Sequence, residues 1–237
     1  MGKIDIENIY KVTKQHYVKA KESLEIRHNA VYNESADAIS DTIPGYKADY
    51  LEFGSYAKDN FAVLFVDMRN STKRAETLGE EKTFLSMHAY IPALLQVIEH
   101  YDGKVVDIMG DGIMVFFGGR SSSMSKKIAV KSAGLCGKDM LCVRQKVINR
   151  ILKEDNIEWE IDFGVGVTYG KVIVTKIGIN QFYDVKAFGD CVNKASKYSN
   201  KYNKVKVSKS VKHMWSKSKN GKIHFKETED GEGYYLT

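Results

Sequence analysis

The sequence predicts an α+β fold in which helices pack on one face of a mixed β-sheet. The apolar run Phe61–Val66 is typical of a strand buried on both faces. The helical and strand-like patterns that include this run follow the order β-α-β-β-α-β. A composition of 43% hydrophobic residues with two prolines indicates a chain with a packed core. Together these observations predict a ferredoxin-like βαββαβ core.

The chain before this core is predicted to be helical. Residues 3–40 are polar with spaced apolar positions, which indicates a loosely amphipathic helix. Ile43-Pro44-Gly45 interrupts that pattern. We therefore expect an N-terminal helical segment, residues 1–45, followed by a compact domain, residues 46–237.

After the first strand, Glu80–His100 has apolar residues at helical spacing, and Pro92 is expected to distort this helix. Lys104–Met109 and Ile113–Phe117 predict a hairpin that turns at Gly110-Asp111-Gly112. The next predicted elements are a long helix, Met124–Leu152, and a hairpin of Trp159–Val167 and Lys171–Lys176 that turns at Tyr169-Gly170. They are followed by a short helix, Asp190–Asn200, a strand, Val205–Val207, and a terminal hairpin, His224–Leu236.

The formal net charge is +6, and eleven lysines without any acidic residue lie between Lys194 and Lys226. Such a run is usually a solvated face, and its alternative is a surface that attracts a polyanion. Because its aromatic residues follow no stacking repeat, nucleic-acid binding is the weaker interpretation.

Three cysteines, no signal-like start and no run of 18 apolar residues predict a cytoplasmic protein without disulfides or a membrane span.

Two carboxylates are candidates for metal chemistry. Asp67 closes the buried strand, and Asp111 lies at a hairpin tip between glycines. If that strand and hairpin are neighbours in one sheet, both carboxylates meet at one end, where they can hold two divalent ions for phosphoryl transfer. Taken singly, Asp67 is equally typical of a helix cap and Asp111 of a turn.

Four segments, in the right order, together resemble the class III nucleotidyl cyclases. The first two resemble the metal-binding motifs of that family, the third a strand pair, and the fourth the helix of transition-state residues. They are Phe65–Thr72, Asp107–Met114, Phe163–Gly170 and Phe188–Lys197. The resemblance implies the class III cyclase type of βαββαβ core for residues 46–237.

The resemblance implies conversion of a nucleoside triphosphate into a 3′,5′-cyclic monophosphate and pyrophosphate. Asp67 and Asp111, with the Met68 carbonyl, would hold two Mg²⁺ or Mn²⁺ ions. Asn193 would bind the ribose. In this family two chains meet head to tail and share each site, so a homodimer with two equivalent sites is expected.

The sequence departs from the family pattern at several positions. The transition-state arginine falls on Lys197, which keeps the charge but loses the bidentate fork. A phosphate-binding lysine falls loosely on Lys226. The base-selecting pair falls on Asp107 and Lys186, with charges reversed relative to the adenine pattern.

A carboxylate accepts a base N–H, and a lysine donates to a base carbonyl. Uracil and guanine fit Asp107 and Lys186, the cytosine amino group could also donate to Asp107, and adenine fits worst. Alternatively, the two side chains face solvent or each other. An aromatic ring such as Tyr50 could restrict the pocket to a pyrimidine, and its other interpretation is simple packing.

These features resemble the Pycsar pyrimidine cyclases, which make cyclic UMP or cyclic CMP in antiphage defence. We favour UTP as the substrate. The alternatives are a cytidylate, adenylate or guanylate cyclase and a catalytically inactive domain that binds nucleotide. A diguanylate cyclase is disfavoured because the hairpin reads Met109-Gly110-Asp111-Gly112 and not GG[DE]EF.

Overall fold

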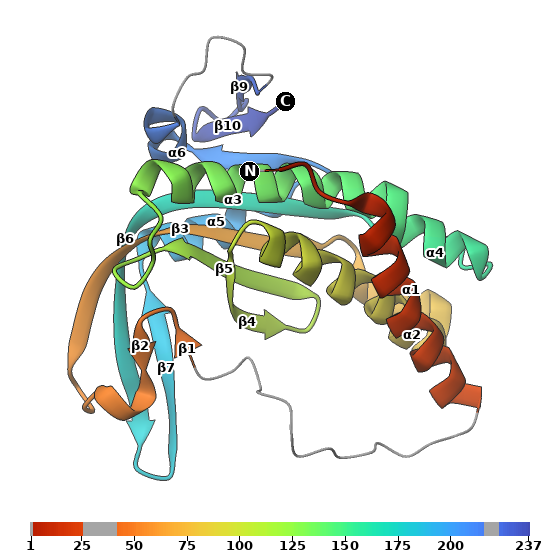
Figure 1. Cartoon of the computed structure of the whole chain (residues 1–237), viewed down its shortest axis with the longest axis horizontal. Coiled ribbons are helices and arrows are strands. Elements are labelled where there is room, and N and C mark those ends of the chain that lie inside the picture. Colours follow the sequence, from red (N-terminus) through yellow and green to blue (C-terminus); the bar gives the residue numbers. More distant parts are fainter. Residues whose placement is uncertain (1, 26–41, 216–222) are drawn as a thin grey trace.

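A computed structural model describes residues 2–25, 42–215 and 223–237. Its main sheet has the strand order β4-β5-β3-β6-β8-β10-β9, and β7 pairs with β6 (Figure 1). The β6–β8 pairing is parallel, and the other pairings of this sheet are antiparallel, so the sheet is mixed. The predicted α+β class is confirmed. No helix in the described residues has the length and apolar character to cross a membrane.

The elements have the following bounds. The helices are α1 (Ile6–Glu25), α2 (Ser71–His100), α3 (Lys126–Val143), α4 (Asn149–Glu154), α5 (Asp190–Tyr198) and α6 (Lys209–Met214), with a 3₁₀ turn at Ala48–Tyr50 and a π-helical turn at Arg144–Ile148. The strands are β1 (Thr42–Ile43), β2 (Tyr46–Lys47), β3 (Tyr56–Met68), β4 (Lys104–Met109), β5 (Gly112–Gly118), β6 (Phe163–Ile179), β7 (Phe182–Phe188), β8 (Val205–Ser208), β9 (Phe225–Glu227) and β10 (Gly233–Leu236).

The ferredoxin-like core is the unit β3-α2-β4-β5-α3-β6. Its strands lie in the order β4-β5-β3-β6, so β3 is central and pairs with both β5 and β6. The run Phe61–Val66 forms the middle of β3 and is buried on both faces, as its unbroken apolar character predicts. This strand ends at Met68, one residue after Asp67.

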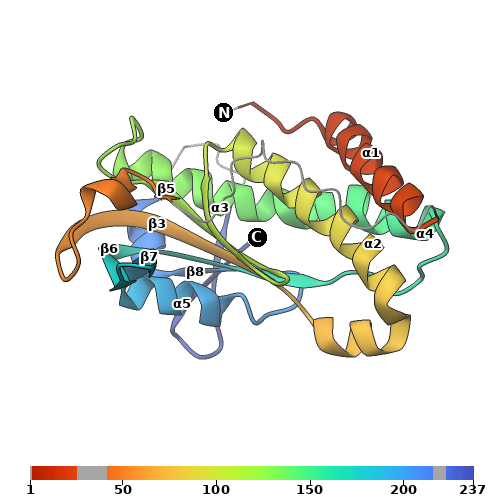
Figure 2. The same cartoon turned by 90° about the horizontal axis from the view of Figure 1, so that it is seen from below.

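Alternate residues of β3 point into two separate apolar clusters. Ala62, Leu64 and Val66 join the larger cluster with α1, α2 and α3. Phe61 and Val63 join a smaller cluster with the β1–β2 hairpin and α5. Figure 2 shows α1, α2 and α3 on one side of the sheet and α5 on the other. The helices α1, α2 and α3 thus form the predicted layer on one face of the sheet. The short helix α5 covers the second face, which the prediction left without a helix.

The predicted N-terminal helix is present as α1, and residues 26–41 of the prediction lie outside the described part. Helix α1 packs along α2 and is tied to the end of α4. Tyr10 and Lys14 both bond to Glu154, and Tyr17 donates to Asp155 at 2.8 Å. The segment is thus attached through a buried stripe and a row of polar contacts.

Two expectations about regular structure are wrong. Residues 163–179 form one continuous strand, β6, so the chain does not turn at Tyr169-Gly170. The hairpin turn comes later, between β6 and β7. In α2 the non-helical backbone lies at Gly79, whose φ is 79°, and not at Pro92. Glycine supplies a positive φ without steric penalty, whereas Pro92 keeps helical backbone angles within α2.

Candidate functional site

Asp67 and Asp111 lie at the same end of the sheet. Val66 pairs with Ile113 in the antiparallel β3–β5 ladder, so the next residue of β3, Asp67, lies opposite the start of β5. A Cβ atom built on Gly112 would lie 3.5 Å from Asp67 Oδ1. Because Asp111 precedes Gly112, both residues lie at the same end of the sheet, as the sequence predicted.

The guanidinium of Arg69 forms an ion pair with the Asp67 carboxylate. The Arg69 backbone N–H donates to the carbonyl of Asp162 at 2.7 Å, which fixes the chain as it leaves β3. A basic residue two positions after Asp67 was the available signal for this pairing. The carboxylate therefore already has a cationic partner within its own chain.

The residues at this end fit divalent cations. Asp111 Oδ2 is buried and has no hydrogen-bond partner in the described part of the chain. Carboxylate oxygens are ligands that Mg²⁺ prefers, together with backbone carbonyls and phosphate oxygens. Met68, predicted to offer its carbonyl, is the last residue of β3. Within residues 2–25, 42–215 and 223–237 no cage of three or more acidic, histidine or cysteine side chains occurs.

Asp107 and Lys186 also lie together. Lys186 Nζ is 3.7 Å from Asp107 Oδ2, although β4 and β7 are not neighbours in the sheet. Strand β1 contacts both of these strands. Both side chains remain partly exposed, so their polar atoms can meet a ligand as well as each other. The alternative that they face each other holds in this structure.

Asp184, which is not among the predicted residues, is a third member of this group. Asp184 Oδ2 is 2.5 Å from Lys186 Nζ, which is closer than Asp107. Its hydrogen bond raises the pKa of Lys186, so the lysine stays a charged donor. Residues two apart on a strand share a face, and that spacing from Lys186 was the available signal.

Helix α5 carries the predicted catalytic residues Asn193 and Lys197. Their side chains are exposed, and their spacing of four residues places them on one side of the helix. The opposite side is seated on the sheet by Cys191 and Ala195. The polar and apolar residues of α5 therefore lie on opposite sides of the helix, and its polar side points away from the sheet.

Gly166 is expected to be essential for the close packing of α5 against β6. A Cβ atom at this position would lie 2.0 Å from the Ala195 carbonyl oxygen, so Gly166→Ala must push the helix backbone away. Overpacking of this kind costs about 2 kcal/mol. We expect thermal denaturation of Gly166→Ala about 4–8 °C below wild type, and of Ser196→Ala, on the exposed side of α5, at the wild-type temperature. A wild-type melting temperature for Gly166→Ala would contradict this packing.

Two predicted substrate-binding residues form no hydrogen bond or ion pair with these groups in the described part of the chain. Tyr50 is 82% exposed and borders a hollow of about 590 Å³ with Tyr46 and Arg120. Lys226 is exposed on β9, at the edge of the sheet and four strands beyond β3. No hydrogen bond or ion pair of the described residues joins either of them to Asp67, Asp107 or Lys186. Their roles stay predictions.

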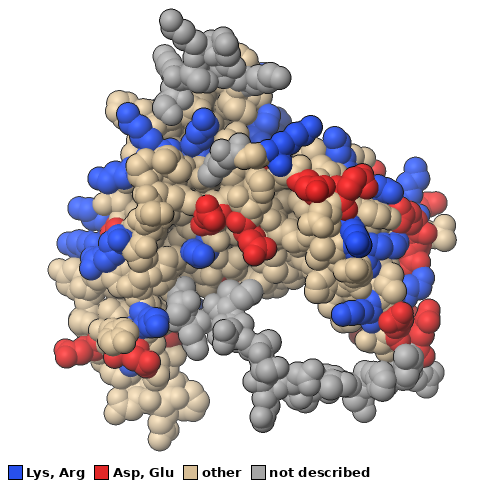
Figure 3. Space-filling view, in the orientation of Figure 1, with Lys and Arg blue, Asp and Glu red and all other residues tan. Residues whose placement is uncertain are grey.

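The lysines of the segment Lys194–Lys226 that the structure describes do not lie on a single face. Lys194 and Lys197 lie on α5, whereas Lys212 lies on α6, which packs on the α3 side of the sheet. Lys206 is buried and bonds to Asp230 at 2.7 Å. Figure 3 shows the side of the molecule that α1, α2 and α3 cover. On this side the basic side chains are scattered and mixed with acidic ones. The lysines at 217, 219 and 222 lie outside the described residues.

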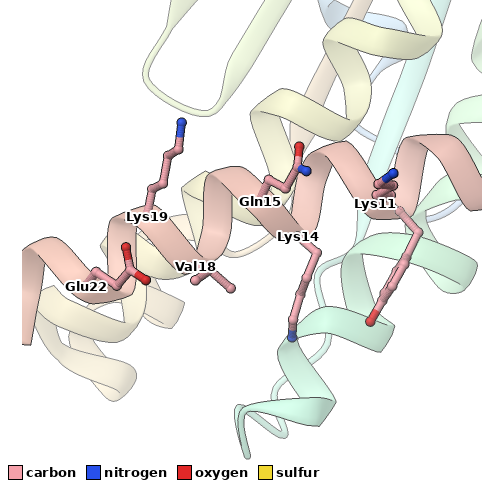
Figure 4. Close-up of a pocket in the computed structure, with 7 residues that line it drawn as sticks. Lys11, Lys14, Gln15, Val18, Lys19 and Glu22 are labelled. Carbon is pink, nitrogen blue, oxygen red and sulfur yellow. The ribbon is translucent and has the colours of Figure 1, made fainter.

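A further hollow, of about 660 Å³, lies beside α1 (Figure 4). All of its lining residues belong to α1, among them Lys11, Gln15, Val18 and Lys19. One further lining side chain, Lys14, is already paired with Glu154. This hollow contains none of the predicted site residues.

Comparison with known proteins identifies several relatives. Residues 53–237 match the family described as the adenylate and guanylate cyclase catalytic domain. A uridylate cyclase of Gulbenkiania mobilis is 30% identical over 178 residues, which cover 72% of this chain and 67% of that protein. A cytidylate cyclase of Staphylococcus aureus is 26% identical over 155 residues, which cover 62% of this chain and 36% of that protein. The match thus spans about a third of the cytidylate cyclase.

Solved structures share the fold. The adenylyl cyclase CyaB from P. aeruginosa has a TM-score of 0.67 at 21% identity and is matched over 77% of this chain and 96% of its own. The guanylyl cyclase Cya2 has a TM-score of 0.61 at 21% identity over 78% of this chain and 94% of its own.

Proposed function

Because the chain belongs to the family of adenylate and guanylate cyclase catalytic domains, we propose that it converts a nucleoside triphosphate, foremost UTP, into the 3′,5′-cyclic monophosphate and pyrophosphate. The observation that supports this proposal is the position of Asp67 and Asp111 at the same end of the sheet, together with a buried oxygen of Asp111 that lacks a hydrogen-bond partner in the described residues. Burying an unpaired carboxylate oxygen is costly, and a bound cation at Asp111 would offset that cost.

In the proposed reaction each residue has a separate task. Asp67, Asp111 and the Met68 carbonyl would hold two Mg²⁺ or Mn²⁺ ions, which would neutralise the triphosphate and acidify the 3′-hydroxyl. Asn193 would hold the ribose so that its 3′ oxygen lies in line with the α-phosphorus. Lys197 would pair with phosphate oxygens that gain charge as the bond to pyrophosphate breaks. Lys226 would bind phosphate at the rim.

The base would be read by Asp107 and Lys186. Uracil offers N3–H to the carboxylate and O4 to the lysine, so both side chains are satisfied. Adenine leaves the lysine without a carbonyl partner, and an unpaired polar group at the base edge gives such sites their discrimination. The uridylate and cytidylate cyclases among the relatives support a pyrimidine. Tyr50 would narrow the pocket.

The proposal is tested by incubating the protein with ATP, GTP, CTP and UTP together and Mn²⁺, and by separating the products by chromatography. We expect one dominant cyclic nucleotide, cyclic UMP, with pyrophosphate. Cyclic CMP as the dominant product would establish the cytidylate alternative. Absence of any cyclic product from a folded dimer would favour an inactive nucleotide-binding domain, for which the lysine at position 197 is the best support.

Reversing the charge of the base-reading carboxylate is expected to change substrate choice. Asp107→Lys places two cations at the base edge, so kcat/KM for UTP should fall about 10- to 100-fold. The activity with ATP should rise relative to UTP. Glu22→Lys, the same charge change on α1, is the matched control. An unchanged preference among the four nucleotides would show that Asp107 does not read the base.

We propose a head-to-tail homodimer with two equivalent sites. The β6–β7 hairpin projects from the body of the molecule (Figure 1) and exposes large apolar side chains. Ile179 is 64% exposed and Phe182 is 74% exposed. A contiguous apolar arm of this kind is typical of an interaction surface. A second copy covering it would bring α5 of one chain to the carboxylates of the other.

The division into residues 1–45 and a catalytic domain of residues 46–237 stays a proposal. Its boundary falls within the β1–β2 hairpin, in which Ile43 pairs with Tyr46. Cytoplasmic location and a role of the cyclic nucleotide as a signal in antiphage defence are proposed from the resemblance to the Pycsar cyclases. Nucleic acid is not proposed as a partner.

A further inference from the structure

Helix α2 contains a buried hydroxyl that its own packing does not explain. Tyr90 is completely buried, and its Oη has no hydrogen-bond partner among the described residues. Buried polar atoms are almost always paired, and an unpaired one calls for a functional explanation. Asp111 Oδ2 and Arg69 Nε are buried and unpaired in the same way.

These groups belong to one neighbourhood. The Tyr90 ring packs on Phe163 with centroids 5.7 Å apart, and Phe163 pairs with Met68 where β3 ends. Tyr90 therefore lies beneath the strand ends that carry the predicted metal ligands. Burial raises the pKa of Tyr90, the charge of Asp111 raises it further, and the charge of Arg69 lowers it. The hydroxyl thus stays protonated and within the field of both charges.

We propose that Tyr90 is a positioning residue, whose hydroxyl donates to the Asp111 carboxylate and directs its other oxygen toward the divalent ion that the proposed function requires. A tyrosine hydroxyl is a donor and a carboxylate is an acceptor, so each supplies what the other lacks. Carboxylates that bind metals are commonly held by such outer hydrogen bonds. Neither Tyr90 Oη nor Asp111 Oδ2 has a partner among the described residues, so the proposed hydrogen bond requires a side-chain rotation that brings them together.

The test replaces only the hydroxyl. For Tyr90→Phe we expect the Kd for Mn²⁺, measured by electron paramagnetic resonance of free Mn²⁺ with 3′-deoxy-UTP present, to rise about 10- to 100-fold. The melting temperature in EDTA should stay the same or rise, because an unpaired buried group is removed. If Tyr90 had only a structural role, its replacement would not weaken Mn²⁺ binding while leaving the melting temperature unchanged.

Two other buried tyrosines serve as matched controls. Tyr101 donates to Asp139 at 2.6 Å and Tyr17 donates to Asp155 at 2.8 Å, both outside the predicted site. Tyr101→Phe and Tyr17→Phe should lower the melting temperature and leave Mn²⁺ binding unchanged. In an Asp111→Asn background, Tyr90→Phe should have no further effect on Mn²⁺ binding, because the two groups act as one unit.

The possible results distinguish the role of Tyr90 from the proposed function. Wild-type Mn²⁺ affinity in folded Tyr90→Phe overturns the proposal and leaves the proposed function intact. A variant that melts well below wild type in EDTA, or fails to fold, also overturns it, because the hydroxyl would then be a structural group. Failure of the wild-type protein to bind Mn²⁺ with nucleotide would instead contradict the proposed function on which this inference depends.

Discussion

Asp67→Asn and Asp111→Asn should each lose about 10³-fold or more in kcat, because removal of a metal-ligating charge removes several kcal/mol of transition-state stabilisation. Asparagine has the shape of aspartate, so packing at the sheet end is kept. Asp111 Oδ2 has no hydrogen bond within the described residues to lose, and the amide oxygen of an asparagine at position 67 can still accept from Arg69. The measurement is steady-state kinetics of cyclic nucleotide formation.

Asp102→Asn is the matched control, since this exposed residue follows α2 in a left-handed conformation that asparagine tolerates. Its activity should equal that of wild type, and melting temperatures of all three variants should lie close together. A carboxylate variant that cyclises at the wild-type rate would refute the metal assignment of that residue.

Mixing two inactive variants should restore activity. In a head-to-tail dimer, Asp67→Asn damages the half-site of one chain and Asn193→Ala damages the half-site that the other chain contributes. A heterodimer of the two then has one intact site and one site with both defects. With random association, half of the dimers are mixed, so an equimolar mixture should regain about a quarter of the wild-type specific activity.

Two variants with the defect on the same half are the control for this experiment. A mixture of Asp67→Asn and Asp111→Asn leaves every site with a damaged carboxylate, so no activity should return. Recovery in this control, or no recovery in the first mixture despite heterodimers detected by native mass spectrometry, would rule out shared sites.

Local patterns in the sequence predicted the parts of the structure that local physics determines. The run Phe61–Val66 is apolar at every position because both faces of β3 are covered. The Gly110-Asp111-Gly112 turn follows from glycine tolerating a positive φ. Once these two elements pair, Asp67 and Asp111 must lie at the same end of the sheet, so their shared position was predictable.

The remainder depends on packing between distant segments. Gly170 resembled a turn residue, yet a Cβ atom there would lie 2.9 Å from Cys191 Cβ, so it is small to admit α5. The contact of Lys186 with Asp107 joins strands that do not pair. Tyr90 follows the helical apolar spacing, and no sequence pattern reveals that its hydroxyl is unpaired.

The most direct measurement counts the metal ions that the two carboxylates are proposed to hold. Electron paramagnetic resonance of free Mn²⁺, titrated with 3′-deoxy-UTP present, should give about two bound Mn²⁺ ions per nucleotide in the wild-type protein. The double variant Asp67→Asn, Asp111→Asn should lose this nucleotide-linked binding while keeping its fold. Equal Mn²⁺ stoichiometry and affinity in the wild-type protein and the double variant would contradict the account.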